Sequence, residues 1–339
     1  MSKLNPKLFL DEEYEVYDDR RHHRRASYKP NYSPKKSPDE TLYEVTGEAG
    51  ESLDFSYNAS RHEREWIINS LGGFYDQQWF DDILRLLKGG KEASVYQCLA
   101  NDTTSTDYLA AKIYRPRRFR NLKNDHLYRE GRVRLDEDGN EIINGGMHHA
   151  MNVRSVYGLQ LLHTSWIEHE YQALQILHAA GARVPVPYVR GDNAILMEYI
   201  GGANMPAATL NTIDLERDEA RQIFECVIKE IEIMLAHDRI HADLSAYNIL
   251  YWDGEITLID FPQAIHPAEN RNAFRIFERD VSRICEYFNR QGLQADARRI
   301  AKDMWTAYNH RLTPDVHPGL LDGDDEADRV YWQKIMSKD

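Results

Sequence analysis

A short motif and the spacing that follows it constrain this chain more than any other feature. The motif reads Ile240-His241-Ala242-Asp243-Leu244-Ser245-Ala246-Tyr247-Asn248 and comes directly after a predicted amphipathic helix at 215–237. Asp260 follows Asn248 by twelve residues, across two short predicted strands and a turn at Asp253-Gly254. A helix, a loop and a tight hairpin in this order bring three oxygen-bearing side chains, those of Asp243, Asn248 and Asp260, to one place.

These three side chains suit phosphoryl transfer. Asp243 can orient a nucleophile and accept its proton, while Asn248 and Asp260 hold Mg²⁺ against phosphate groups. The pattern H-x-D-L-x-x-x-N followed by I-D-F is typical of the catalytic loop and the metal-binding element of protein kinases, with Ala242 in place of the usual arginine. We therefore expect an enzyme that uses ATP and Mg²⁺.

The chain upstream of the motif has the residues that the other half of such a site needs. Lys112 lies among alanines and an isoleucine in a predicted strand at 108–114, where a lysine needs a partner. It corresponds to the strand lysine that holds the α- and β-phosphates in kinases. Glu170, in the middle of a predicted helix at 164–178, is the carboxylate expected to pair with it. A solvent-exposed place on that helix stays open as the alternative for Glu170.

The loop expected to cover the phosphates differs from the glycine-rich loop of ordinary protein kinases, since only Gly90 stands at one of its three glycine positions. The segment 87–96 instead resembles the S-x-G-K-E-A-x-V-Y loop of the RIO family of atypical kinases. Six further motifs resemble that family in the same order: Trp166-Ile167-Glu168-His169-Glu170-Tyr171, Ala180-Gly181 with Val184-Pro185-Val186-Pro187, Met197-Glu198-Tyr199-Ile200-Gly201, His241-Ala242-Asp243-Leu244-Ser245, Ile259-Asp260-Phe261-Pro262-Gln263-Ala264, and His266-Pro267 with Arg279-Asp280-Val281. The resemblance covers roughly residues 80 to 290.

By this resemblance the chain is identified as a member, of bacterial type, of the RIO family of serine/threonine protein kinases. The resemblance implies an α+β, two-lobe, protein-kinase-like fold, with a small β-rich N-lobe at about 61–197 and a helical C-lobe at about 201–339. It implies no activation segment for peptide docking. It also implies Mg²⁺-dependent phosphoryl transfer from ATP to protein serine or threonine, including autophosphorylation, or ATP hydrolysis with transient phosphorylation at the position of Asp260.

The resemblance assigns roles by position. Asp243, Lys112 and Glu170 would be the catalytic residues, and Asn248 and Asp260 the metal ligands. The nucleotide would be bound by Gly90, Lys91, Ser94, Val95, Lys112, Met197, Tyr199, Ser245 and Asn248. Within that set Lys91 and Ser94 would lie over the phosphates, and Met197 and Tyr199 at the adenine hinge. Ser245 stands where ordinary protein kinases have a lysine, so one contact with the γ-phosphate is missing and slow turnover is expected.

The distribution of charge leaves two other functions open. The formal net charge is −13, yet the stretch from Lys112 to Arg134 has nine basic and two acidic residues. Because RNA affinity comes largely from phosphate neutralisation, the Arg115–Arg134 stretch permits contact with a ribosome or rRNA, and the chain could be a nucleotide-switched scaffold. These arginines could equally pair with acidic groups of the protein. A small-molecule phosphotransferase of the aminoglycoside or choline kinase kind is the other alternative, since it shares H-x-D and I-D motifs.

The remaining expectations concern the ends of the chain and its surroundings. Residues 1–60 are polar and lack an apolar period, which predicts a mostly disordered tail. Two short helices, at 66–71 and 79–87, are expected to follow, separated at Gly72-Gly73. No run approaches the roughly 18 apolar residues that a membrane span needs, no signal peptide is evident, and the three cysteines are far apart. We expect a reducing, cytoplasmic setting and no membrane partner.

Overall fold

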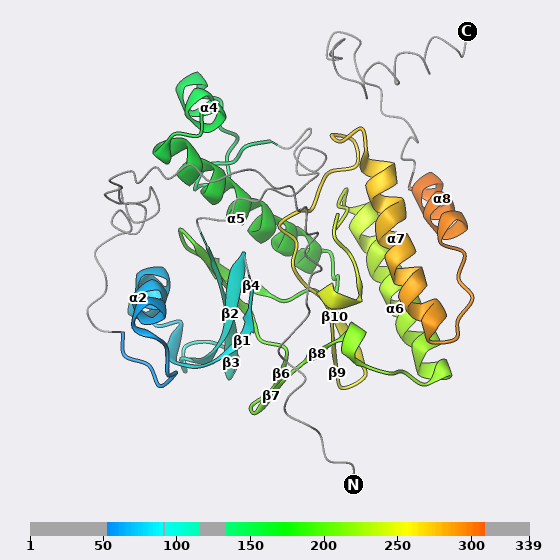
Figure 1. The fold of residues 1–339 in the computed structure, drawn as a ribbon, viewed down its shortest axis with the longest axis horizontal. Coiled ribbons are helices and arrows are strands. Elements are labelled where there is room, and N and C mark those ends of the chain that lie inside the picture. Colours follow the sequence, from blue (N-terminus) through cyan, green and yellow to red (C-terminus); the bar gives the residue numbers. More distant parts are fainter. Residues whose placement is uncertain (1–52, 91, 116–132, 309–339) are drawn as a thin grey trace, which may run out of the picture. The chain divides into compact units, whose positions relative to one another are not determined.

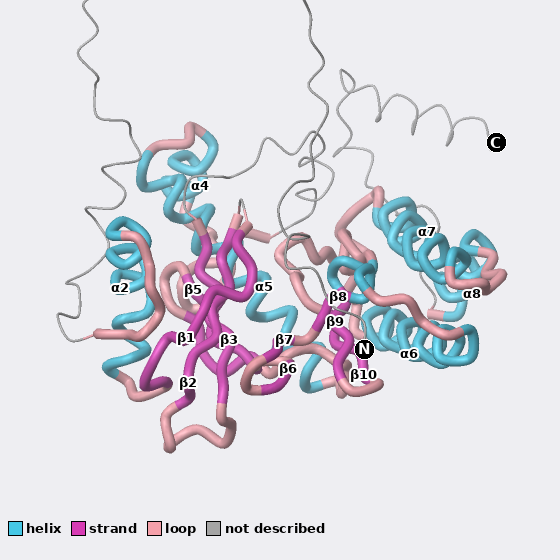
Figure 2. The backbone as a smooth tube through the Cα atoms, turned by 60° about the horizontal axis from the view of Figure 1, so that its bottom comes forward, coloured by secondary structure: helices cyan, strands magenta, loops and turns pink. Residues whose placement is uncertain are grey.

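The computed structural model describes residues 53–90, 92–115 and 133–308, which all belong to one compact unit, 38–339. Its first part is built on an antiparallel sheet, and its second part is mostly helical (Figures 1 and 2). The predicted α+β arrangement of a β-rich N-lobe and a helical C-lobe is therefore confirmed.

Five antiparallel strands form the sheet of the N-lobe, in the order β1-β2-β3-β5-β4. Their bounds are β1 Phe80–Gly89, β2 Ala93–Ala100, β3 Tyr108–Tyr114, β4 Pro187–Arg190 and β5 Ala194–Glu198. β2 and β3 pair as a hairpin, and β3, the predicted strand at 108–114, lies in the middle of the sheet between β2 and β5. The strand that carries Lys112 is therefore held by hydrogen bonds on both sides.

The two faces of this sheet pack against different helices. Side chains alternate between the faces of a strand. One face packs on α2 (Arg61–Asp76), with the buried set Ile67, Leu71, Tyr96, Cys98, Ala111, Ile113 and Leu196. The other face packs on α5 (Val156–Ala179), with Ala110, Tyr114, Ile167, Ile195 and Met197. A shorter helix, α4 (Gly145–Asn152), precedes α5, and Figures 1 and 2 show α2 and α5 on opposite sides of the sheet.

Two predictions for the start of the ordered chain were wrong. α2 runs through Gly72-Gly73 without a break, and the predicted second helix is strand β1. Three register shifts in the β1–β2 pairing interrupt the two-residue alternation that marks a strand, so its apolar residues resemble a helical pattern. Leu53 and Phe55, within the predicted tail, are buried against the N-lobe, whereas residues 1–52 lie outside the described part.

Within the described residues of the C-lobe, 201–308, the structure has three α-helices and several short strands. The helices are α6 Arg217–Ala236, α7 Ala273–Arg290 and α8 Ala297–Ala307. The strands are β6 Gly201–Gly202, β7 Met205–Pro206, β8 Ala208–Thr209, β9 Ile249–Trp252 and β10 Glu255–Leu258. β9 and β10 form the predicted hairpin, and β8 extends it to three strands. A single core joins α6, α7 and α8 to the loop at 240–246. None of the described helices is long and apolar enough to cross a membrane.

Candidate active site

The central strand β3 directs Lys112 into the face that α5 covers. Lys112 lies between Val95 of β2 and Ile195 of β5 in the pairing register, and it is 7% exposed. A buried ammonium group needs a compensating charge. The structure supplies two carboxylates, those of Glu170 and Asp260, so Lys112 has the partner that was expected from the sequence.

Glu170 is the first partner of Lys112. α5 begins after Ser155, whose side chain caps the helix by accepting from the backbone N–H of Gly158, and Glu170 lies on the buried side of the helix, 1% exposed. Its Oε1 is 2.6 Å from Nζ of Lys112. Its Oε2 accepts a hydrogen bond of 2.5 Å from the hydroxyl of Tyr114. The exposed alternative for Glu170 is excluded by this burial.

Asp260 is the second partner of Lys112, at 2.6 Å between Oδ1 and Nζ. Burial alone would raise the pKa of Asp260, but the ammonium group of Lys112 outweighs it and lowers that pKa to about 2. Burial alone would lower the pKa of Lys112, and the carboxylates of Asp260 and Glu170 instead raise it above its usual value. Asp260 and Lys112 are therefore both charged at neutral pH.

The loop between α6 and β9 carries Asp243 and is tied to the segment before Asp260. The backbone N–H of Asp243 donates to Nδ1 of His241 (3.3 Å), and Nε2 of His241 lies 3.0 Å from the carbonyl of Ile259. In this pattern Nδ1 accepts a hydrogen bond and Nε2 donates one. Ala242 has a φ of 65° and Asp260 a φ of 73°, the left-handed region that residues other than glycine rarely adopt. Left-handed backbone of this kind gathers at functional sites.

Asp243 and Asn248 meet within this loop. The amide group of Asn248 donates to the backbone carbonyl of Asp243 at 3.0 Å, and Nδ2 lies 3.5 Å from Oδ2 of the same residue. Oδ1 of Asp243 receives a hydrogen bond of 2.8 Å from Nη1 of Arg283, on α7. Ser245 is half-buried between them and precedes the short 3₁₀ turn Ala246–Asn248. The structure thus brings together Lys112, Glu170 and Asp260 as one group, and Asp243, Ser245 and Asn248 as the loop beside it.

The predicted adenine side of the site lies on the same face of the sheet as Lys112. Val95, Met197 and Tyr199 belong to the cluster that packs on α5, and Met197 and Tyr199 are each 8% exposed. Gly90 makes a tight loop, in which a Cβ would lie 2.9 Å from the carbonyl oxygen of Ala93. These four predicted nucleotide residues therefore lie along one side of the sheet and its first loop.

Ser94 does not join that group. It alternates with Val95 on β2, so its side chain belongs to the opposite face, next to Ile113 in the register. The residue is 1% exposed, and its Oγ accepts a hydrogen bond of 3.1 Å from Arg115. A place for this side chain over the phosphates, as expected from the sequence, does not fit this geometry. Lys91 lies outside the described residues.

The donors present suit a hard cation such as Mg²⁺. Asn248 uses its amide hydrogens within the loop, which leaves its carbonyl oxygen for a cation, and Oδ2 of Asp260 is not engaged by Lys112. Carboxylate and amide oxygens are the ligands that Mg²⁺ uses together with phosphates. Among the described residues no group of three or more His, Cys, Asp or Glu side chains could hold a metal. Asp260 and Asn248 therefore fit a metal that a nucleotide brings.

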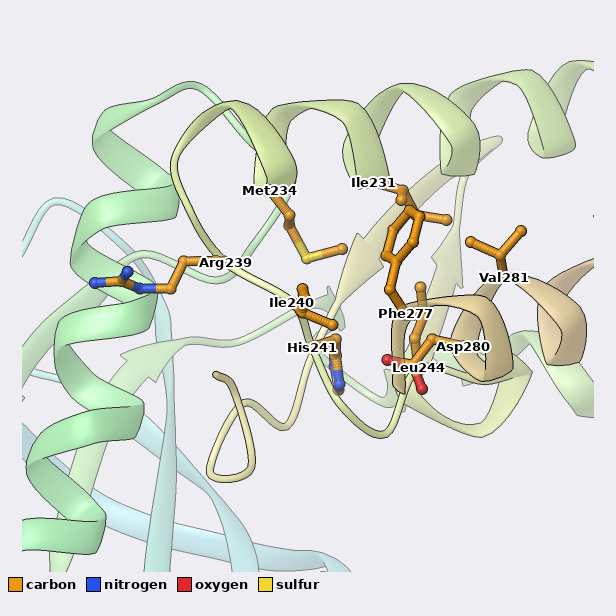
Figure 3. Close-up of a pocket in the computed structure, with 9 residues that line it drawn as sticks. All are labelled: Ile231, Met234, Arg239, Ile240, His241, Leu244, Phe277, Asp280 and Val281. Atoms are coloured by element: carbon orange, nitrogen blue, oxygen red, sulfur yellow. The ribbon is translucent and has the colours of Figure 1, made fainter. Parts of the chain in front are cut away.

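A small cavity lies behind the loop rather than in the site. It is about 10 Å³ in volume and is lined by Ile231, Met234, Arg239, Ile240, His241, Leu244, Phe277, Asp280 and Val281 (Figure 3). That space is close to that of a single water molecule. In Figure 3 the loop residues His241 and Leu244 lie against α6 and α7. The cavity is a packing gap where the loop at 240–246 meets the helical core.

Sequence reasoning missed two residues of this site. Tyr114, the last residue of the predicted strand at 108–114, had no assigned role, although its hydroxyl contacts Glu170. Arg283 had no assigned role, although it contacts Asp243 across 40 residues of sequence. The sequence held a signal for Tyr114, which lies two positions after Lys112 on one strand face. Arg283 lies one helical turn after Arg279-Asp280, but that spacing does not identify Asp243 as its partner.

A family model described as the RIO domain matches residues 94–300. The RIO-type serine/threonine-protein kinase Rio1 of Haloferax volcanii is 30% identical over 212 residues, which are 61% of this chain and 63% of that protein. Rio1 of Methanocaldococcus jannaschii is 24% identical over 295 residues, 79% of this chain and 90% of that protein.

The match covers only part of the length of some of these relatives. The chain spans 63% of the Haloferax volcanii protein and 36% of the serine/threonine-protein kinase RIO1 of Caenorhabditis elegans. A solved structure of the Rio2 kinase-ADP/Mg²⁺-phosphoaspartate complex from Chaetomium thermophilum has a TM-score of 0.48 and 18% identity. That match covers 80% of this chain and 75% of the other.

Proposed function

The chain belongs to the RIO family, and we propose that it transfers the γ-phosphate of ATP, with Mg²⁺, to a serine or threonine hydroxyl of a protein, itself included. The observation that supports this most is the position of Lys112, whose Nζ is 2.6 Å from both Glu170 and Asp260. A cation that binds phosphates and a carboxylate that binds the metal are thereby joined at one point, next to the loop that carries Asp243. Phosphoryl transfer depends on such positioning and charge stabilisation.

Each residue has a role that its surroundings support. Lys112 would bind the α- and β-phosphates, and Glu170 would fix the position of its ammonium group. Asn248 and Asp260 would hold Mg²⁺, which neutralises the phosphate charge that develops during transfer. Gly90, Val95, Met197 and Tyr199 would line the adenine and phosphate side, as their place on the sheet suggests.

Asp243 would act on the acceptor. The hydroxyl oxygen forms a bond to the γ-phosphorus while the bond between that phosphorus and the β,γ-bridging oxygen breaks. ADP leaves with the electron pair of the broken bond, and the hydroxyl proton passes to the Asp243 carboxylate. Asp243 is 44% exposed at its side chain, so an acceptor group can reach it from solvent.

Hydrolysis and small-molecule phosphorylation are the competing activities. Water in place of the hydroxyl gives ATP hydrolysis by the same residues, and attack by Asp260 would give an aspartyl phosphate. The aminoglycoside or choline kinase alternative has no support in the family match, which is to the RIO domain. We therefore propose protein phosphorylation or ATP hydrolysis by this one site.

Incubation with γ-labelled ATP and Mg²⁺ tests the proposal. We expect the wild-type chain to bind ATP and to transfer label, and Asp243→Ala and Asp260→Ala to lose transfer. Asp253→Asn, in the exposed turn between β9 and β10, serves as the matched control and should behave as wild type. Acid-stable label indicates serine or threonine, whereas acid-labile label indicates an aspartyl phosphate. A wild-type chain that neither transfers nor releases the γ-phosphate contradicts the proposed function.

The prediction that the chain contacts RNA rests on the positive charge of the Arg115–Arg134 stretch alone. Of the Arg115–Arg134 stretch, residues 116–132 lie outside the described part. At its ends Arg115 donates to Ser94 and lies over the Trp66 ring, and Arg134 donates to Asn152. Contact with a ribosome or rRNA therefore stays a prediction, which a steep decrease in rRNA affinity with rising salt would support.

The reducing, cytoplasmic setting also stays a prediction. All three cysteines are free, with Cys98 and Cys285 buried. Burial raises the pKa of the Cys98 thiol above its usual range and that of Cys285 to about 11. Both thiols are therefore protonated and unreactive at neutral pH, as buried structural cysteines are.

A further inference from the structure

Arg283 contacts the proposed catalytic aspartate directly. Nη1 of Arg283 is 2.8 Å from Oδ1 of Asp243, with side chains that are 40% and 44% exposed. Within the described part of the chain, Arg283 is the one cationic side chain within 4 Å of this carboxylate. Ser245, two positions after Asp243, is uncharged. The positive charge beside Asp243 therefore comes from α7 and not from the loop itself.

Packing and hydrogen bonds hold α7, the helix that carries Arg283, in place. Arg279, Asp280 and Arg283 are spaced so that they share one side of the helix. Arg279 donates to the carbonyl of Ala242 and lies 2.9 Å from Oδ1 of Asp280, which is 2% exposed. The rest of the helix is anchored by Ile276, Phe277, Val281, Ile284, Cys285, Tyr287 and Phe288, all of them buried. One rigid helix thus holds both the backbone before Asp243 and its side chain.

The two oxygens of Asp243 have different surroundings. Oδ1 receives the short hydrogen bond from Arg283, whereas Oδ2 has only a contact of 3.5 Å with Nδ2 of Asn248. A contact of that length is a weak hydrogen bond at most. Oδ2 is therefore the oxygen with capacity to accept a proton.

We propose that Arg283 is a positioning residue for phosphoryl transfer, which holds Oδ1 so that Oδ2 of Asp243 faces the acceptor hydroxyl. This inference rests on the proposed role of Asp243 as the group that orients the acceptor. A guanidinium group suits the task because its donors are fixed in a plane, so it fixes the carboxylate plane with little loss of its own freedom. Arg283 acts through Asp243, so its loss affects the transfer step more than nucleotide binding.

Steady-state kinetics of three variants test the inference. We expect Arg283→Gln to lower kcat about 10- to 100-fold, the range that a misplaced catalytic group produces, with KM for ATP changed less than about twofold. Arg283→Lys should recover part of the loss, because one donor and the charge remain. Arg275→Gln, exposed on the same helix, is the matched control and should keep the wild-type kcat. The thermal unfolding midpoint of Arg283→Gln should stay within about 3 °C, since the pair is half-exposed.

A double-mutant cycle separates positioning from a general structural effect. In an Asp243→Asn background we expect Arg283→Gln to change the residual rate less than about threefold, because residues that act as a unit are not additive. Losses that multiply in the double variant, or a kcat of Arg283→Gln equal to or above that of wild type, overturn the inference. A wild-type chain that binds ATP without turnover overturns the proposed function, and this inference with it. An active wild type with an unaffected Arg283→Gln overturns this inference alone.

Discussion

Tyr114 donates its hydroxyl hydrogen to Oε2 of Glu170 at 2.5 Å, while Lys112 uses the other oxygen, Oε1, at 2.6 Å. The backbone N–H of Phe261 also points to Oε1, at 3.3 Å. Glu170 is 1% exposed, so each of these donors replaces water that the carboxylate has lost. One carboxylate on α5 thereby links the central strand of the N-lobe to the segment that carries Asp260.

We expect Tyr114→Phe to lower both stability and activity. It leaves one oxygen of a buried carboxylate without its donor, which costs about 1–3 kcal/mol in the free energy of unfolding. Phosphoryl transfer should fall roughly tenfold, as a small shift of Glu170 misplaces the ammonium group of Lys112. Tyr108→Phe on the same strand face is the matched control, since the hydroxyl of Tyr108 has no hydrogen bond in the described part. Denaturant unfolding and transfer assays measure both effects, and equal losses in the two variants contradict this assignment.

Lys112→Met should destabilise the fold more than the same substitution of a solvent-exposed lysine would. Removal of the ammonium group leaves Glu170 as an uncompensated buried charge, which costs about 3–5 kcal/mol. Adding Glu170→Gln removes that charge, so the double variant Lys112→Met/Glu170→Gln should be about 1–2 kcal/mol more stable than Lys112→Met. Neither variant should transfer phosphate. Urea unfolding of the three proteins decides the matter, and a Lys112→Met variant as stable as wild type would falsify the buried pair.

The free energy of unfolding should depend on the charge of Asp260 in the acidic pH range. The pKa of Asp260 in the folded chain is lowered to about 2, below that of the unfolded chain. A carboxyl group of this kind stabilises the fold above its unfolded pKa, and its contribution is lost as the pH falls from about 4 towards 2. Because the Asp260 side chain is 39% exposed, solvent screening reduces this contribution to about 1 kcal/mol.

Asp260→Asn provides the comparison for that pH dependence. Relative to wild type, its free energy of unfolding should be lower at pH 6, and the difference should shrink to near zero at pH 2. The raised pKa of Lys112 acts at the opposite end, with stability present through neutral pH and lost as the pH rises above the usual lysine range. Urea unfolding at pH 2, 4 and 6 gives the result. A difference that is constant with pH means that Asp260 is not held by Lys112.

The proximity of the candidate site residues could be predicted because their order and spacing in the sequence are specific. Asp243, Asn248 and Asp260 lie within 18 residues of one another on a loop and a hairpin, where local geometry dictates proximity. Lys112 could be predicted because a lysine among buried strand residues needs a counter-charge. The strand character of β1 could not, since its register shifts remove the alternation on which strand prediction depends.

Motif spacing predicted the contact between Lys112 and Glu170, but other contacts between distant segments could not be predicted from the sequence alone. The pairing of Arg283 with Asp243 depends on the packing of α7 against the loop at 240–246. Likewise, the face of β2 on which Ser94 lies follows from the registry with β3, which places it next to Ile113. A shift of one residue would exchange the faces of Ser94 and Val95. Motif resemblance names such positions but does not say where each side chain points.

The left-handed backbone of Ala242 predicts which substitutions the loop at 240–246 tolerates. Ala242 has a φ of 65° and is 0% exposed, a conformation that costs an L residue about 1–2 kcal/mol and that glycine adopts freely. Ala242→Gly should therefore change the free energy of unfolding by less than about 1 kcal/mol, because relief of strain offsets the greater freedom of glycine in the unfolded chain. Ala242→Val should lower the free energy of unfolding by about 2–4 kcal/mol, since valine is strained there and overfills a closed site.

Ala246→Gly is the control for these substitutions. Ala246 is buried in the same loop at an ordinary negative φ, so its replacement by glycine should lower the free energy of unfolding by about 1 kcal/mol. Denaturant unfolding of the three variants measures these differences, and a loss for Ala242→Gly as large as that for Ala246→Gly would show that residue 242 is not held in the left-handed region in solution.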